Sequence, residues 1–145
     1  MGKSIDRVQI FDTPAAVERK LGQPTAIAYG DFAGFIYEYN DGRPAGLEVL
    51  FLELAEPLQD RAIQITASAP YRGTSKEGVG IGTPKAVARM VLGTPAMPRC
   101  PVDWDRFGVR TIYGDIYPFR PSAIVVNYGG DNRIESIRII WLGEE

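Results

Sequence analysis

Hydrophobic and polar residues alternate in short segments along the chain, as they do in strands that pack one face of an antiparallel sheet. In one such segment Leu47, Val49 and Phe51 share a side and Glu48 faces the other way. Residues 4–11 fit either a strand or a short helix. Turn-forming residues at 40–44 and 129–132 separate neighbouring segments, and the second turn suits a hairpin. The pattern predicts strands at about 35–39, 46–54, 62–67, 110–117, 123–128 and 134–142.

Two other segments have helical spacing and are similar in sequence. Residues 13–24 read TPAAVERKLGQP, and residues 83–95, about 70 positions later, read TPKAVARMVLGTP. In each, a threonine suits the N-cap, a proline suits the first helical position, and a glycine suits the residue after the helix end. The predicted helices, about 14–21 and 84–92, have roughly two turns and are too short to persist alone in water. They must be held against a larger structure.

Each predicted helix is followed by about three predicted strands. The sequence therefore predicts an α+β fold of two tandem repeats, each a short helix or helix pair packed on an antiparallel sheet, with the sheets joined side by side. Repeat 1 would span residues 1–72 and repeat 2 residues 83–145, with a glycine-rich linker at 73–82. Because units of about 70 residues are marginal alone, we expect one cooperative body.

Composition and charge exclude several classes of protein. Hydrophobic residues make up 45% and charged residues 23% of the chain, which are ordinary globular values. The 16 basic and 18 acidic residues give a net charge of −2 with no long run of one sign, so the basic footprint of a nucleic-acid-binding protein is missing. No segment approaches the roughly 18 apolar residues of a membrane span. As given, the chain is predicted to be soluble and cytoplasmic, or periplasmic or secreted if a leader has been removed.

The usual catalytic and metal-binding residues are scarce. The sequence has no histidine, the commonest general base and metal ligand. Its single cysteine, Cys100, has no histidine to activate it and no second cysteine to pair with. The glycines at 78–82 do not have the register of a phosphate-binding loop and are interpreted as a linker turn. We therefore predict a protein that is not an enzyme and that holds no cofactor and no metal.

One pattern in the sequence is similar to that of a known family: a threonine start, an apolar helix and the motif Leu-Gly-x-Pro. The motif occurs at Leu21–Pro24 and again at Leu92–Pro95. The pattern resembles the family of the β-lactamase inhibitory protein and the single-repeat small lipoprotein of the outer-membrane β-barrel assembly machinery. The resemblance implies repeats with a helical layer on a four-stranded sheet, whose concave face grips a partner protein. The chain lacks the paired cysteines and the export signal of the inhibitor. No contact residue of the inhibitor can be matched to a position here, so β-lactamase inhibition is not implied.

The first function hypothesis follows from aromatic residues on the predicted strands. Tyrosine and tryptophan offer large contact areas at little cost in entropy, and they are enriched at protein interfaces. Packing inside the sheet is the alternative interpretation for each of them. We expect a non-catalytic protein that binds a protein partner, with an inhibitor or immunity role as one form of that function. The candidate partner-binding residues are Tyr37, Tyr39, Trp104, Tyr113, Tyr117 and Tyr128.

The alternative hypothesis is a module that binds a small apolar ligand, or acts on one, in a groove between the repeats. Arg72, Asp103 and Asp115 are its candidate polar anchors. Asp103, Asp105 and Asp115 do not have the register of a calcium loop, and Asp103 and Asp105 fit solvated loop residues as well. A homodimer that buries the aromatic face is a third hypothesis.

Overall fold

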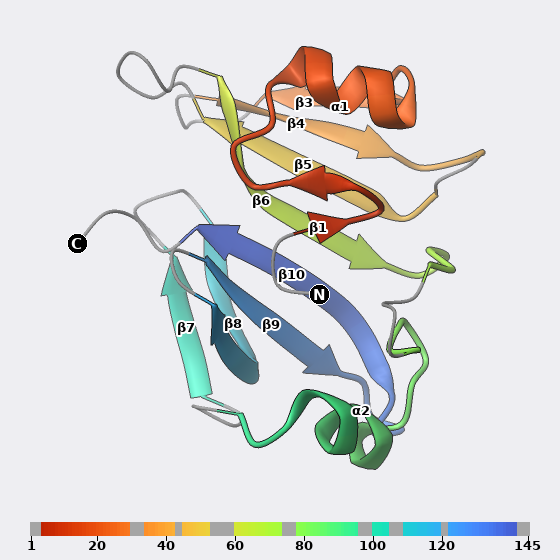
Figure 1. Cartoon of the computed structure of the whole chain (residues 1–145), viewed down its shortest axis with the longest axis vertical. Coiled ribbons are helices and arrows are strands. Elements are labelled where there is room, and N and C mark those ends of the chain that lie inside the picture. The colour runs from red at the N-terminus through yellow and green to blue at the C-terminus, as the bar shows by residue number, and fades with distance from the viewer. Residues whose placement is uncertain are drawn as a thin grey trace.

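The computed structural model describes residues 4–29, 34–42, 45–52, 60–73, 78–95, 100–104, 109–119 and 122–141. Eight antiparallel strands form one sheet in the order β3-β4-β5-β6-β10-β9-β8-β7 (Figure 1). The strands are β3 (Ala26–Tyr29), β4 (Gly34–Tyr39), β5 (Leu47–Leu52), β6 (Arg61–Ser68), β7 (Cys100–Trp104), β8 (Val109–Phe119), β9 (Ser122–Tyr128) and β10 (Ile134–Trp141).

One face of the sheet, called the inner face here, carries the main core. Helix α1 (Pro14–Leu21), helix α2 (Lys85–Leu92) and the small hairpin of β1 (Ser4–Ile5) and β2 (Val8–Gln9) each contribute buried residues to that core. The two helices lie at opposite ends of the sheet, and the hairpin lies between them over β6 (Figure 1). One row of fully buried residues crosses the middle of the inner face through neighbouring strands: Val49, Ile65, Ile139 and Ile124.

The central pairing is between β6 and β10, and it joins the strands that follow α1 to those that follow α2. Ile137 lies opposite Ala67 and Ile139 opposite Ile65 in this antiparallel pair. Main-chain hydrogen bonds therefore run without interruption from β3 to β7. A smaller apolar cluster on the opposite side contains Leu50, Leu52 and Ile63.

Both helices are eight residues long and end at a glycine with positive φ, as the sequence predicts. At the start of α1 the Thr13 hydroxyl accepts a hydrogen bond from the Ala16 amide at 3.1 Å. The start of α2 differs from the prediction, because Pro84 is the cap and the Thr83 hydroxyl accepts instead from the Gly80 amide. The extra residue of the second segment is thus accommodated before the helix. Within the described ranges, no helix is both long and apolar enough to cross a membrane.

The predicted fold class, an α+β arrangement of two tandem repeats, is wrong. The chain is mainly β: one continuous sheet dominates, and the helices are two short pieces at its ends. Each helix buries only one side chain completely, Val17 in α1 and Ala88 in α2, so the helices do not form a layer of their own. The β6–β10 pairing leaves no boundary between two sheets, a contact that strand patterns cannot reveal.

The six strands predicted from alternation are all present, with ends shifted by up to two residues. Strands β3 and β7 were not predicted, because the first is only four residues long and the second contains a proline. Residues 4–9 form the β1–β2 hairpin, so of the strand and the short helix predicted as alternatives for this segment, the strand is present. The 129–132 turn joins β9 to β10 as the sequence predicts.

Candidate functional site

Helix α2 is attached to the sheet by an ion pair whose carboxylate is buried. Arg89 donates from Nε to Asp115 Oδ2 at 2.8 Å and from Nη2 to Asp115 Oδ1 at 2.7 Å. The Tyr128 hydroxyl donates to the same carboxylate at 3.0 Å. Lys85, one turn before Arg89, places its ammonium 5.3 Å from the centre of the Tyr128 ring. Both oxygens of Asp115 therefore have partners, and helix, β8 and β9 meet at one carboxylate.

The electrostatics of this anchor follow from where Asp115 lies. It projects from β8 onto the inner face beside Val126 and has no exposed surface. Burial alone raises the pKa of Asp115, but the hydrogen bonds from Arg89 and Tyr128 outweigh that effect and the pKa is lowered. The same pairing raises the pKa of Arg89. The pair is charged at neutral pH and fixes the inner side of α2 to the sheet.

The outer side of α2 carries an exposed apolar stripe. Val87, Met90 and Val91 follow the i, i+3, i+4 spacing of one helix face. Their exposed fractions are 41%, 78% and 39%. We call these three residues the α2 stripe. An exposed apolar stripe along one helix face is typical of a binding surface.

Helix α1 provides an internal comparison for the α2 stripe. The matching positions of α1 hold Ala16, Arg19 and Lys20, of which Lys20 forms an ion pair with Asp12 at 2.7 Å. A short helix at the end of this sheet can therefore fold with a polar outer side. The apolar residues of the α2 stripe are not required by the position of the helix.

Basic side chains lie at the start of α2. A shallow cavity of about 450 Å³ at the start of α2 is lined by Lys85, Arg89 and Arg133, with Asp131 as its only acidic lining residue among those described. Asp131 accepts a hydrogen bond from the Arg133 amide. Arg89 is already paired with Asp115, so the remaining charges of the lining are Lys85, Arg133 and Asp131.

The structure places three of the predicted partner-binding tyrosines in the core. Tyr37, Tyr39 and Tyr117 are buried, and Tyr128 is half-buried against Asp115. The hydroxyls of the three buried tyrosines bond to Glu18, the Gly22 carbonyl and the Gly93 carbonyl respectively. The expectation that these strand tyrosines form an exposed face is corrected here: they point to the inner face, where the helix ends cover them. The side chains of Trp104 and Tyr113 lie outside the described part of the structure.

The predicted ligand anchors are not brought together. Asp115 is saturated by Arg89 and Tyr128 and is closed to solvent. Arg72 is exposed in the segment that follows the central strand β6, on the rim of a different pocket. The side chains of Asp103 and Cys100 lie outside the described residues. Among the residues described, no group of three or more acidic or cysteine side chains is placed to hold a metal ion.

Sequence reasoning missed the residues that distinguish this end of the molecule, Arg89 and the α2 stripe. A difference in sequence between the two helical segments indicates these residues. Where TPAAVERKLG has Arg19 and Lys20, TPKAVARMVLG has Met90 and Val91. Reading the two segments for their differences, rather than for their shared pattern, would have marked the second helix as the one with an unexplained apolar face.

Comparison with known proteins gives a match in structure only. No family model matches the sequence, and no curated protein matches it significantly. An extracellular protein containing a SCP domain from Bacillus anthracis is similar in structure, with a TM-score of 0.63 and 9% identity. That match covers 97% of this chain and 49% of the other. A cysteine-rich secretory protein from Staphylococcus aureus is also similar, with a TM-score of 0.58 and 10% identity over 91% of this chain and 43% of that one.

These matches correct the family suggested by the sequence. The similar chains are described as an SCP-domain protein and a cysteine-rich secretory protein, so the resemblance to the β-lactamase inhibitory protein and the assembly lipoprotein is wrong. The Leu-Gly-x-Pro segments, on which the resemblance was based, indicate only that the two helices end in a similar way. At 9% and 10% identity the likeness is one of fold, and the chain spans about half the length of each similar protein. Both are described as extracellular or secretory, and a cytoplasmic location finds no support in them.

Proposed function

We propose that the chain is a non-catalytic protein-binding module that works outside the cytoplasm, and that the α2 stripe is its contact surface. The observation that carries the proposal is the exposure of Val87, Met90 and Val91 on a helix whose inner side is already fixed by Arg89. This keeps the function expected from the sequence and moves its surface from the strand tyrosines to α2.

The geometry suits insertion of the helix into a groove of the partner. An amphipathic helix binds in this way through residues at i, i+3 and i+4, the spacing of the α2 stripe. Met90 is the most exposed of the three, and its flexible thioether adapts to irregular apolar surfaces. The Arg89–Asp115 pair holds the helix in place beforehand, so little ordering entropy is lost on binding.

The charges beside the α2 stripe indicate which kind of partner it would bind. Lys85 and Arg133 flank the start of α2, so an apolar groove with an acidic rim is complementary to this end of the molecule. A second copy of the chain is a poorer occupant, because a two-fold interface sets the same patch against itself and would bring these cations together. The proposed occupant is therefore a different protein, with an apolar, acid-rimmed groove.

The two similar structures support the proposed location. Each is about twice as long as this chain, and their descriptions name an extracellular protein containing a SCP domain and a secretory protein. A fold that occupies about half of such chains is compatible with a role as a binding module.

Site-specific cross-linking tests the proposal while the partner is still unidentified. A photoreactive residue is placed at Met90 in one variant and at Arg19, the matching exposed position of α1, in another. We expect a discrete cross-linked product in native extracts from position 90 and none from position 19. No product at position 90, or equal products at both positions, would contradict the proposal.

A further inference from the structure

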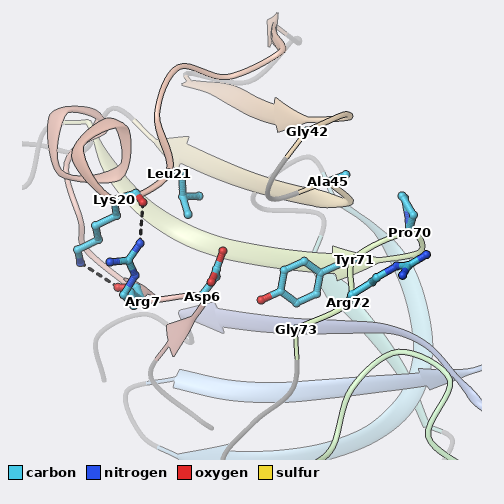
Figure 2. A pocket seen from close by; sticks show the side chains of 10 residues that line it. All are labelled: Asp6, Arg7, Lys20, Leu21, Gly42, Ala45, Pro70, Tyr71, Arg72 and Gly73. Atoms are coloured by element: carbon cyan, nitrogen blue, oxygen red, sulfur yellow. Dashed lines mark hydrogen bonds between the residues drawn. The ribbon is translucent and has the colours of Figure 1, made fainter.

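A pocket of about 670 Å³ opens beside the end of α1, and the residues that line it include none of α2 (Figure 2). Four segments surround it: the β1–β2 turn, the end of α1, the loop after β4 and the residues that follow β6. Its volume lies in the range typical of small-molecule sites, about 300–1,000 Å³. Its charged lining residues are Asp6, Arg7, Lys20 and Arg72.

The turn that brings two of these charges to the pocket is strained. Asp6 and Arg7 connect β1 to β2, and both have positive φ, at 52° and 73°. Two-residue turns of this kind favour asparagine followed by glycine, because a side chain at positive φ costs energy. A residue as large as arginine at the second position is therefore unfavourable for the turn itself. Strain of this kind is found where a side chain is needed at a functional site.

Arg7 and Lys20 hold each other in place across the pocket wall. Arg7 Nη2 donates to the Lys20 carbonyl at 2.9 Å, and Lys20 Nζ donates to the Arg7 carbonyl at 2.9 Å (Figure 2). Lys20 also pairs with Asp12 at 2.7 Å, which satisfies its charge. The guanidinium of Arg7 keeps further N–H donors that bond to none of the described residues.

Tyr71 forms another wall, and two glycines make room for it. A Cβ on Gly46 would come within 2.6 Å of the Tyr71 amide, and a Cβ on Gly73 would overlap the Tyr71 ring. Figure 2 shows the Tyr71 hydroxyl directed toward Asp6, with Arg72 on the other side of Tyr71. Burial, and then the charge of Asp6, raises the pKa of Tyr71 to about 12. The hydroxyl is therefore a neutral hydrogen-bond donor or acceptor at physiological pH.

Three charges of the pocket have no opposite charge among the described residues: the carboxylate of Asp6 and the guanidiniums of Arg7 and Arg72. We propose that this pocket binds a small zwitterion with one ammonium and two carboxylate groups, such as a short acidic peptide. The ammonium would meet Asp6 beside the aromatic ring of Tyr71, and the carboxylates would meet Arg7 and Arg72. This site is independent of the α2 stripe and of its protein partner.

Calorimetric titration with the dipeptide alanyl-glutamate tests this, because the dipeptide carries one ammonium and two carboxylates. We expect binding at millimolar or lower concentration, and weaker binding of the N-acetylated dipeptide, which has lost the ammonium. Loss of one charge-assisted hydrogen bond should weaken binding about tenfold.

Two substitutions remove pocket charges with little effect on the fold. Asp6→Asn keeps a residue that tolerates positive φ, and Arg72→Gln changes an exposed side chain. Each should raise the Kd about tenfold, whereas Arg19→Gln on the outside of α1 should not change it. Absence of binding at about 10 mM dipeptide, or equal affinity of wild type and both pocket variants, would overturn the proposal. Undiminished binding of the N-acetylated dipeptide would equally exclude the role given to Asp6.

Discussion

The two ends of the sheet are built alike on the inside and differently on the outside. At each end an eight-residue helix stops at a glycine whose carbonyl accepts a tyrosine hydroxyl, Tyr39 to Gly22 at 3.0 Å and Tyr117 to Gly93 at 3.2 Å. The fifth residue of each helix bonds to a side chain of the sheet, but with opposite polarity. Glu18 accepts from the Tyr37 hydroxyl at 2.9 Å, whereas an arginine in α2 forms an ion pair with a buried aspartate.

This comparison distinguishes the inner contacts that a helix needs in order to fold from the residues that it exposes to solvent. Helix α1 is held by the tyrosine hydrogen bonds to Glu18 and to the Gly22 carbonyl, and it has a polar outer side. Helix α2 has a stronger inner anchor in Arg89–Asp115 and an apolar outer side. Because the inner anchor does not use Val87, Met90 or Val91, these residues are free for another role. Substitutions at matched positions of the two helices can test that separation.

The largest expected effect comes from removing the cation of α2. Arg89→Met leaves the buried carboxylate of Asp115 without its charged partner. Because the Arg89 side chain is 35% exposed, the cost should be near the lower limit of the range of about 3–5 kcal/mol for a fully buried pair. Glu18→Gln, the matched change in α1, weakens one hydrogen bond and should cost about 1 kcal/mol. Urea denaturation of both variants measures the two losses. Equal losses would show that the two helices are anchored with equal strength.

Alkaline pH should destabilise both ends of the sheet, because burial raises the pKa of Tyr37 and Tyr39 at the α1 end and of Tyr117 and Tyr128 at the α2 end. Burial, followed by the hydrogen bond and charge of Glu18, raises the pKa of Tyr37 to about 12. A raised pKa means that the folded state holds the proton more tightly than the unfolded state. The resulting stability is complete below about pH 10 and is lost as the pH rises through about 12, by roughly 2 kcal/mol for this residue. Denaturation at about pH 9 and about pH 11.5 measures the decrease, and Tyr37→Phe should reduce it.

The tyrosine bonds at the helix ends should contribute equally. Tyr39→Phe and Tyr117→Phe each remove one hydrogen bond to a helix-terminal carbonyl, so each should lower the free energy of unfolding by about 1 kcal/mol. Thermal denaturation of the two variants side by side gives the comparison. If only one variant loses free energy of unfolding, the two tyrosine bonds are alike in geometry but not in their contribution to stability.

The sequence allowed accurate prediction of local structure and poor prediction of assembly. Alternating residues such as Leu47 and Val49 identified six strands, and Gly22 and Gly93 identified both helix ends. The pairing of β6 with β10, which makes one sheet of all eight strands, depends on contacts far apart in the chain and has no local signal. The burial of Tyr37 also could not be predicted, because alternation shows that residues share a face but not which face is covered.

The smallest expected effect on stability comes from the outer side of α2. The variant V87A/M90R/V91K gives α2 the outer residues of α1, and its free energy of unfolding should stay within about 0.5 kcal/mol of wild type. Alanine, arginine and lysine are good helix formers, so the helix itself should be maintained. Urea denaturation is again the measurement. A loss above about 1 kcal/mol would mean that the α2 stripe serves the fold.

Calorimetric binding of the protein captured through position 90 is the most direct test of the role given to α2. Wild type and V87A/M90R/V91K are titrated with that purified protein under the same conditions. If Val87, Met90 and Val91 form the contact surface, the triple substitution should weaken binding at least about a hundredfold, which corresponds to about 2.7 kcal/mol. Equal affinity of the two proteins would contradict the assignment of the α2 stripe as the binding surface.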